Sequence, residues 1–475
     1  MIIKNKRLEI ISEFKKKTGD ATDITYKDIP INNEIITAIY SNSVSSSISI
    51  NDFILRRLDE EKSKIKTKDL FLYIKNYIPN NNGKEITEEE ISYYVLSGFT
   101  IILFENNKGI LAFENKADLY SEINKSEKEK SLKGPTDAFS ENYQSNIGMI
   151  RRRIKSENLW FKEARVGKKS QTMVAIFYLN KTCDEKLVND IYKKIKNIDI
   201  EYAGNTNYVL EAISNSQRNV FPTNLYTERP DYACQMIMEG RIILMVENSN
   251  EVAILPTLFL DFFKSPSDYY EKSINVTANR FVRFIAFILA ILTPAMYIAL
   301  MAFNWESLPS DLLISFSIQR DGVPFSTVFE IVTMIFMFQI LRESDIRFPG
   351  KGGSSISIVG ALVLGQAAVD AGIVSPITII IVGICSIASL AFSSIELVNS
   401  IRWWQLFLII LAALFGFIGI VFGILILLAI LVSEQSCGKP YFSPFEPFNL
   451  NGQSDAIILN TKSKLHPKNI FIRRK

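Results

Sequence analysis

The sequence is nearly devoid of histidine and poor in cysteine, the residue types on which many catalytic and metal sites depend. Its 475 residues include one histidine, His466, and four cysteines that lie far apart and form no CxxC pair. A histidine-based triad and a metal site with several histidines are therefore excluded, and the cysteines indicate neither a disulfide framework nor a zinc site. Residues 167–170 (Gly-Lys-Lys-Ser) resemble the end of a phosphate loop but lack the glycine five residues earlier. We expect no metal, no cofactor and no enzymatic activity.

A strong net charge and a signal peptide are also missing. Lysine and arginine number 53 against 50 aspartates and glutamates, and this formal net charge of +3 does not indicate a nucleic-acid partner. The chain begins Met-Ile-Ile-Lys-Asn-Lys-Arg and continues as a charged amphipathic stretch without an apolar run. We therefore expect no cleavable signal peptide and a cytosolic amino-terminal domain.

Charge is distributed unevenly along the chain. Charged residues crowd the stretch 1–272, whereas 281–432 carries very few outside short connecting loops. This asymmetry predicts a soluble α/β amino-terminal region and a polytopic α-helical membrane domain at 276–435, followed by a basic carboxy-terminal tail at 436–475.

The soluble half contains a repeated pattern. Residues 95–113 and 237–255 each read as the end of a helix closed by glycine, a strand, a polar turn and a second strand. Upstream, 38–40 (Ala-Ile-Tyr) and 175–177 (Ala-Ile-Phe) form a further matching pair of strand starts. We favour two tandem α/β subdomains, at 1–120 and 136–275, joined by a charged linker at 121–135. Coincidence between two generic α/β segments is the alternative.

A basic run lies early in the second subdomain. Arg151, Arg152 and Arg153 are followed by Lys155. They are a candidate cytosolic contact for anionic lipid or a protein partner. A solvated helix face is an equally good interpretation, because isoleucines recur beside the run at helical spacing.

Five apolar segments follow Tyr270, at 281–303, 327–341, 356–374, 377–397 and 405–432. The last is the most apolar, and Trp403 and Trp404 at its start are expected to be interfacial anchors. The second and third are poor simple spans, because they carry Glu330, Gln339, Gln366 and Asp370. These four residues are candidates for the lining of a polar path or pore. Tight packing within a helix bundle is the alternative, since the third segment is rich in glycine and alanine.

The basic residues that flank these segments bear on topology. They are Arg280, Arg283, Arg342, Arg347, Lys351, Arg402 and the tail residues 473–475. Placing all of them on the cytoplasmic side requires an even number of crossings. Of four or five membrane segments, we favour four crossings, with one middle segment re-entrant or interfacial.

Several blocks resemble the A subunits of spore germinant receptors, the GerA family of spore germination proteins. In the membrane half the resemblance covers 320–325 (Arg-Asp-Gly-Val-Pro-Phe), 341–343, 346–349, 357–369 and 371–376. In the soluble half and the tail it covers Asn146, 150–155, 225–231 (Leu-Tyr-Thr-Glu-Arg-Pro-Asp), 262–270, 438–441 and 443–445. It places a motif loop and hinge at Pro324, Arg342, Glu343, Arg347, Pro349, Gly360 and Gly365.

The resemblance implies a multi-pass protein of the spore inner membrane that acts with germinant receptor B and C subunits and with membrane lipid. It implies nutrient sensing and the triggering of germination by an oligomeric ligand-gated ion channel formed by self-association. The small nutrient germinant is expected on the B subunit. Related sequences often carry glutamates where Ile335 and Gln339 stand here. A dense acidic ring is therefore in doubt, and Glu330 becomes the first acidic residue to test.

Two other classes of function compete with this one. A secondary transporter would use broken helices at the bilayer midplane, but corresponding broken segments in two membrane halves are not found. A membrane scaffold would use the soluble repeat to cluster the receptor and the helices as an anchor. Conductance of a reconstituted complex separates these classes.

Overall fold

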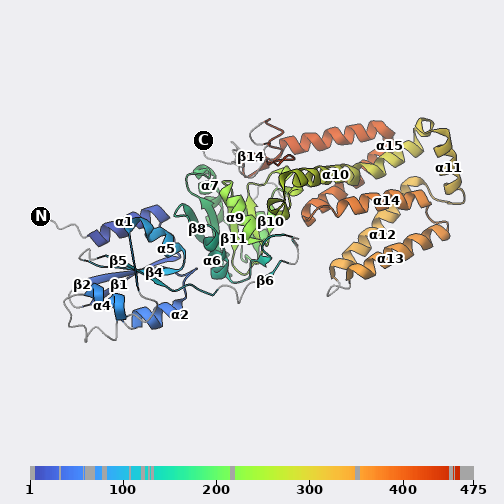
Figure 1. Ribbon diagram of the computed structural model, residues 1–475. Coiled ribbons are helices and arrows are strands. Elements are labelled where there is room, and N and C mark those ends of the chain that lie inside the picture. The colour runs from blue at the N-terminus through green and yellow to red at the C-terminus, as the bar shows by residue number, and fades with distance from the viewer. Residues whose placement is uncertain are drawn as a thin grey trace.

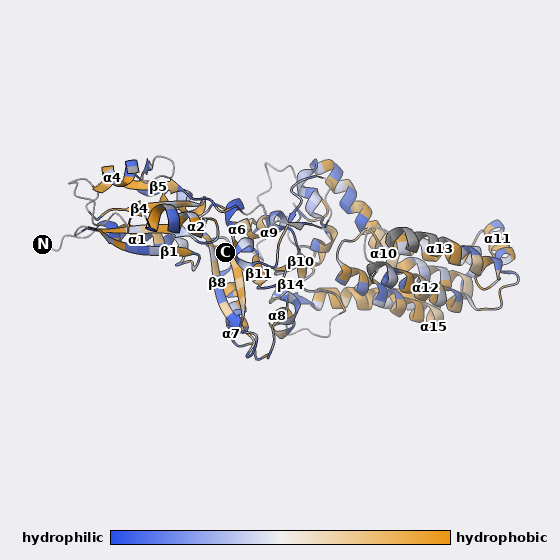
Figure 2. Cartoon of the chain, turned by 90° about the horizontal axis from the view of Figure 1, so that it is seen from below, coloured by the Kyte–Doolittle hydropathy of each residue, from blue (hydrophilic) through white to orange (hydrophobic). Residues whose placement is uncertain are grey.

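The computed structural model describes residues 6–31, 34–56, 58, 70–77, 83–105, 109–118, 124–126, 129, 133–213, 220–347, 353–448, 453 and 455–459. The molecule is elongated, with a first sheet, a second sheet and a body of helices following one another along its length (Figure 1). Figure 2 shows the same order from another side, with α11 at the end opposite the amino terminus. We call the part from α10 to α15 the helical body.

The first sheet has five antiparallel strands in the order β1-β2-β4-β5-β3. These strands are β1 (Ile24–Ile31), β2 (Glu34–Ser41), β3 (Lys84–Ile86), β4 (Phe99–Leu103) and β5 (Ile110–Glu114). The helices around it are α1 (Lys6–Thr18), α2 (Ser47–Ser49), η1 (Ile50–Leu55), α4 (Leu70–Tyr77), η2 (Glu88–Glu90) and α5 (Ile91–Leu96). The central strands β2, β4 and β5 are largely buried, because helices cover the sheet.

The second sheet has the order β10-β12-β11-β9-β8, which in reverse matches the first sheet strand for strand. Its strands are β8 (Leu159–Val166), β9 (Thr172–Leu179), β10 (Leu225–Thr227), β11 (Ile242–Val246) and β12 (Val252–Leu255). Its helices are α6 (Tyr143–Arg153), α7 (Glu185–Lys196), α8 (Thr206–Ile213) and α9 (Pro230–Met238), and a small ribbon of β6 (Asn124–Lys125) and β7 (Asp137–Ala138) precedes it. One topology used twice is what a duplicated unit predicts.

The strand register differs by one residue from the match drawn on the sequence. Ile101 of β4 pairs with Ile39, and the corresponding Ile243 of β11 pairs with Phe177. Ile39 is thus equivalent to Phe177, whereas the sequence match places it opposite Ile176. A shift of one residue moves a side chain to the other face of a sheet. Both faces of β9 are buried, so its apolar pattern does not reveal the shift.

The helical body contains α10 (Ser273–Ala302), η5 (Trp305–Ser307), α11 (Ser310–Arg320), α12 (Thr327–Arg347), α13 (Gly353–Asp370), α14 (Pro376–Ser389) and α15 (Ile395–Ser433). By length and composition, α10 and α15 are the two helices among the described residues that could cross a membrane. The helix α11 is not among the segments that the sequence predicts, because it mixes polar and apolar residues.

The helix α15 reverses direction at Gly416, whose backbone angles are φ 59° and ψ −137°. A Cβ on Gly419 would clash with the carbonyl oxygen of Leu411, and one on Gly423 would clash with the side chain of Leu408. Residues eight and fifteen positions apart come this close only if the two halves run antiparallel. The segment 405–432, predicted as one span, is therefore a helical hairpin.

The chain passes along the helical body six times, in α10, α12, α13, α14 and the two halves of α15. Ser400 at the start of α15 donates a hydrogen bond to the carbonyl of Val220, and Ser436 after its end donates to that of Thr223, so both ends meet the second sheet. At the opposite end Gly416 lies against Phe303. The chain thus makes six passes along the helical body, whereas the prediction of four membrane crossings stays a prediction.

We predict that Gly416→Ala lowers the stability of the protein. A residue with a Cβ is strained at this φ and ψ by about 1–3 kcal/mol, and the added atom would lie 3.0 Å from the Phe303 side chain. The thermal unfolding midpoint of the purified full chain in detergent measures the effect. Gly383→Ala is the matched control, because a Cβ on this helical glycine of α14 would have no atom within 4 Å. Equal midpoints for the two variants would contradict the reversal at Gly416.

Candidate functional site

A buried carboxylate lies in the first turn of α12, at the end of the helical body far from the sheets. Glu330 is 1% exposed. Its Oε2 accepts hydrogen bonds from the backbone nitrogen of Ser375 at 2.8 Å, from Ser375 Oγ at 2.9 Å and from Thr378 Oγ1 at 2.9 Å. Ser375 is the N-cap of α14. The positive end of the α14 dipole therefore faces the negative charge of Glu330 and stabilises it.

The second oxygen of this carboxylate is not satisfied in the same way. Glu330 Oε1 accepts no hydrogen bond from any residue that the structure describes. Arg320 Nε, at the end of α11, lies 3.8 Å away and likewise has no hydrogen-bond partner in the described part of the chain. The Tyr297 hydroxyl of α10 lies beside Ser375 and Thr378 and is also buried and unpaired among the described residues. Each such buried polar atom costs about 1–3 kcal/mol.

The other predicted lining residues do not join Glu330. Gln339 lies on the same helix and is half-buried, but it is nine positions further on, or about 13 Å along the axis. Gln366 Nε2 donates to Asp370 Oδ1 at 2.9 Å on the exposed face of α13. Within one copy of the chain the structure thus places Glu330, Gln339 and the Gln366–Asp370 pair at three separate positions, and not in one continuous lining.

The predicted motif loop and hinge residues occupy different environments. Pro324 is exposed in the loop before α12, and Arg342 Nη1 contacts Ser389 Oγ of α14 at 3.4 Å. A Cβ on Gly360 would meet Leu341, and one on Gly365 would meet Ile379, so the two glycines bring α13 against α12 and α14. Glu343 is exposed. The side chain of Arg347 and the whole of Pro349 lie outside the described residues.

Arg151 of the basic run is buried and is not available for the predicted lipid or partner contact, whereas for Arg152 and Arg153 that contact stays a prediction. Arg151 is fully buried, and its Nε and Nη2 donate to the two oxygens of Asp23 at 3.2 and 3.1 Å. Arg153 pairs with Asp137, and Arg152 is half-buried. Because Asp23 precedes β1 and Arg151 lies in the last turn of α6, this ion pair joins the first sheet to the second. A partner 128 positions away could not be read from the local sequence.

A chain of buried ions joins the second sheet to the helical body. It runs through Arg241, Asp261, Lys264, Asp455, Arg280, Asp268 and Arg283. Lys264 Nζ donates to Asp455 Oδ2 at 3.1 Å, and Arg280 Nη1 donates to Asp455 Oδ1 at 2.8 Å. We call this set the junction network. It connects the turn before β11, the short helices η3 (Phe259–Phe263) and η4 (Pro266–Tyr270), the first turns of α10 and the tail.

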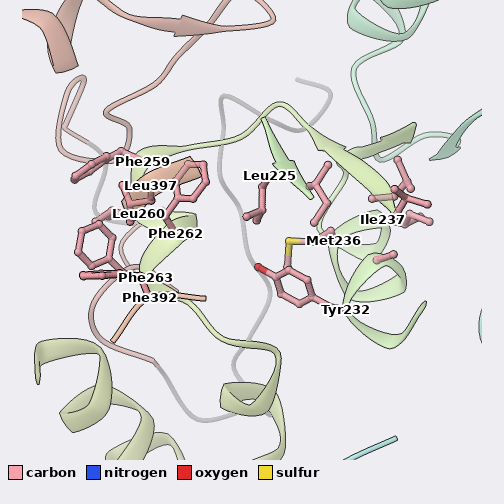
Figure 3. Close-up of a cluster of buried hydrophobic side chains, with 14 of the residues drawn as sticks. Leu225, Tyr232, Met236, Ile237, Phe259, Leu260, Phe262, Phe263, Phe392 and Leu397 are labelled. Carbon is pink, nitrogen blue, oxygen red and sulfur yellow. The ribbon is translucent and has the colours of Figure 1, made fainter. Parts of the chain in front are cut away.

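Aromatic packing surrounds the junction network. Figure 3 shows Phe259, Leu260, Phe262 and Phe263 of η3 close to Phe392 and Leu397 of the helical body. The rings of Phe263 and Phe392 are 5.6 Å apart, centre to centre. Trp404, predicted as an interfacial anchor, is instead buried and stacks on Phe221 with ring centres 5.9 Å apart. Trp403 is 67% exposed, as an anchor would be.

The charges of the junction network control the ionisation of its carboxyls. Burial by itself would raise the pKa of Asp261, but the charges of Arg241 and Lys264, with hydrogen bonds from Arg241 and the Leu258 backbone, lower it to about 2. Burial would likewise raise the pKa of Asp455, but Lys264 and Arg280 lower it. Both carboxyls are therefore ionised at neutral pH and form part of a paired network.

A cavity of about 1340 Å³ lies where the second sheet meets α15, and its wall includes Tyr226, Glu251, Glu396 and Trp403. Burial and the charges of Glu396, Glu211 and Glu251 raise the pKa of Tyr226 well above its usual value. Among the described residues no group of three or more histidine, cysteine, aspartate or glutamate side chains is placed to hold a metal ion.

Sequence reasoning selects Glu330 but not the residues around it. The residues around it come from three different helices: Arg320 from α11, Tyr297 from α10, and Ser375 and Thr378 from the start of α14. The Ser375-Pro376 pair is the one local signal, because serine before proline is typical of a helix start. Nothing in the sequence near Arg320 indicates that its side chain reaches α12.

We predict that Asp455→Ala destabilises the protein by about 3–5 kcal/mol, because it leaves two buried cations without their partner. The midpoint of chemical unfolding of the full chain measures the change. Asp199→Ala is the matched control, since it removes an exposed aspartate whose ion pair with Lys168 is also exposed. A loss no larger than that of the control would show that the tail does not complete the network.

We also predict a loss of stability at acid pH that depends on Asp261. Its pKa is about 2 in the folded protein against an ordinary value of 3.8. The stability contributed by this lowered pKa is present above the ordinary value and is lost as the pH falls toward 2. Thermal midpoints of the wild type measured from pH 6 downward should fall steeply over this range. The thermal midpoint of Asp261→Asn should be lower than that of the wild type at pH 6 and should fall less as the pH is lowered. Parallel midpoint curves for the two proteins would contradict the lowered pKa of Asp261.

Comparisons with known proteins agree on one family. The model of the Bacillus/Clostridium GerA spore germination protein family matches residues 12–469. Spore germination protein KA of Bacillus subtilis (strain 168) is 34% identical over 452 residues, which are 94% of this chain and 83% of that protein. Spore germination protein GerQA of Bacillus cereus is 31% identical over 472 residues, which are 99% of this chain and 93% of that protein.

A solved structure resembles part of the chain. It is the crystal structure of the N-terminal domain of the A subunit of the Bacillus megaterium spore germinant receptor GerK3, which is 23% identical. It covers 52% of this chain and 94% of its own, with a TM-score of 0.41. On the family model and the relatives above, the chain belongs to the GerA family of spore germination proteins.

Proposed function

We propose that this protein is the A subunit of a nutrient germinant receptor in the spore inner membrane and triggers germination as part of an ion-conducting oligomer. Its partners in this proposal are the B and C subunits, further copies of itself and membrane lipid. The small nutrient germinant binds on the partner B subunit. The relatives named as spore germination proteins support the role in germination.

The surface of the helical body supports the location in a membrane. Many large apolar side chains are exposed on it, among them Phe336, Ile387, Leu414, Phe415, Ile418 and Phe422. So large an apolar surface is costly in water and is covered either by lipid or by neighbouring helices. Six passes would place the sheets and the tail on the same side of the membrane, which we take to be the cytosolic side.

The buried carboxylate of Glu330 is the main support for the proposed ion path. Glu330 is 1% exposed inside an apolar helical body, and burying a carboxylate there costs free energy. Such buried ionisable residues mark functional sites. The Glu330 carboxylate is held at the start of α14, while its second oxygen lacks a hydrogen bond from any described residue. In the proposed receptor, nutrient binding shifts the helices between two arrangements, and this carboxylate takes part in the open one.

The junction network is the route we propose for the signal. One of the blocks that carry the family resemblance, 262–270, contributes Lys264 and Asp268 to it, and a neighbouring contact ties this block to another, 225–231. Tyr270 Oη donates to Asp231 Oδ2 at 2.6 Å, and Asp268 binds Arg280 and Arg283 of α10. A movement of the second sheet therefore acts directly on the first helix of the body.

We predict that Glu330→Gln abolishes or strongly reduces nutrient-triggered release of monovalent cations from spores, because it removes the charge while keeping the shape of the side chain. Cation release is measured after addition of the nutrient, with the amount of each variant checked in spore membranes. Glu306→Gln is the matched control, an exposed acidic residue at the same end of the helical body. Normal release from Glu330→Gln spores would rule out the ion path through this residue.

Conductance of the reconstituted complex tests the channel itself. A purified oligomer that conducts no ions with its partners and nutrient present would favour the membrane scaffold instead. Uptake of a substrate driven by an ion gradient would favour a secondary transporter.

A further inference from the structure

We propose that Glu330 is the charged ligand of a binding site for one monovalent cation, and that the Arg320 guanidinium is a tethered cation that competes for this site. The inference deepens the proposed function and rests on the same carboxylate. It concerns which ion the site binds and which side chain competes with that ion.

The first argument is the set of ligands. Glu330 Oε1 and the Tyr297 hydroxyl are both buried and lack hydrogen bonds within the described chain. Ser375 and Thr378 lie beside the Tyr297 hydroxyl and bind the other oxygen of Glu330. The hydroxyls of Ser375 and Thr378 donate their protons to Glu330 Oε2, and Ser375 Oγ also accepts from the backbone nitrogen of Thr378 at 3.4 Å. A hydroxyl oxygen has two lone pairs, so each still has one that can face a cation. The site therefore offers several oxygens around two unsatisfied ones. Hard cations bind to such oxygen ligands.

The second argument is the charge. Glu330 is the one carboxylate of this cluster among the described residues, and it is balanced by a single positive charge. A divalent cation would leave a buried net charge, and Ca²⁺ and Mg²⁺ sites are normally built with more acidic or water ligands. Sodium or potassium would leave the cluster neutral.

The third argument is the position of Arg320. Its Nε lies 3.8 Å from Glu330 Oε1, which is too long for a hydrogen bond but close enough for charge attraction. The guanidinium neutralises the carboxylate without filling its second hydrogen-bonding position. Arg320 ends α11, a helix with no buried residue, and the loop 321–326 that follows is largely exposed. Few contacts thus hold Arg320 in place, and a movement of α11 would free Glu330 for a small cation.

Thermal unfolding of the full chain in detergent tests the proposal. The wild type and Arg320→Gln are compared in equal concentrations of sodium, potassium and choline chloride, because choline is too large for the site. Arg320→Gln should be stabilised by sodium or potassium and not by choline. The cation concentration that half-saturates this stabilisation should be at least about tenfold lower for Arg320→Gln than for the wild type, because the variant lacks the competing positive charge. Arg165→Gln, which removes an exposed charge from β8, should behave as the wild type.

Two further variants keep the result interpretable. Adding Glu330→Gln to Arg320→Gln should abolish the difference between the three salts. Should Arg320→Gln not fold, Arg320→Met is used in its place, and equilibrium binding of rubidium to it is compared with binding to the wild type. Coinciding midpoints in the three salts, or rubidium binding equal in both proteins, would overturn the proposal.

The readouts separate this proposal from the proposed function. Cation binding is measured on the purified chain, without spores, nutrient or conductance. A cation site in a complex that conducts no ions would refute the channel and leave the site. A complex that conducts ions but shows no cation-specific stabilisation would refute the cation site and leave the channel.

Discussion

The carboxylate of Asp455 is the constraint on which the path of the whole chain depends. It accepts hydrogen bonds from Lys264, which follows η3, and from Arg280 in α10, and all three groups are buried. Removing one member of such a network leaves the other charges buried without a partner or water, so displacing the tail would cost a large free energy. Because the tail must return to the start of α10, the helices between them must pass along the body an even number of times. The reversal at Gly416 makes the count even.

The sequence predicts the repeated sheet unit but not the turn of α15, and the reason is physical. Strands bounded by glycine and polar turns have recognisable edges, so both β4-β5 and β11-β12 can be found. In α15 the turn lies inside a continuous apolar run, and a single glycine makes the reversal. Its cause is the close approach of Phe303 and of the two helix halves, which is a property of the packed structure. The subdomain limits drawn from the sequence remain predictions.

The candidate residues also differ in whether their role can be seen in the local sequence. Glu330 stands out because a carboxylate in an apolar segment is unusual whatever its partners are. Arg151 is easily mistaken for a surface residue because it belongs to a run of arginines, although Asp23, on a distant segment, holds its charge inside. Arg320 belongs to a block of family resemblance, but its place beside Glu330 is not predicted, since it depends on a contact between α11 and α12. Charge patterns thus find sites whose chemistry is local and miss those assembled by tertiary contacts.

The junction network and the Glu330 cluster differ in how completely their charges are paired. In the junction network each of Asp261, Asp268 and Asp455 is bound by at least two basic groups, and such a network resists rearrangement. At Glu330 one oxygen has three donors and the other has none in the described chain. A second arrangement that supplied the missing partner would regain about 1–3 kcal/mol per atom. A difference of that size shifts a two-state population roughly 5- to 150-fold. The junction is therefore suited to transmit a movement, and the Glu330 cluster to change state when the movement arrives.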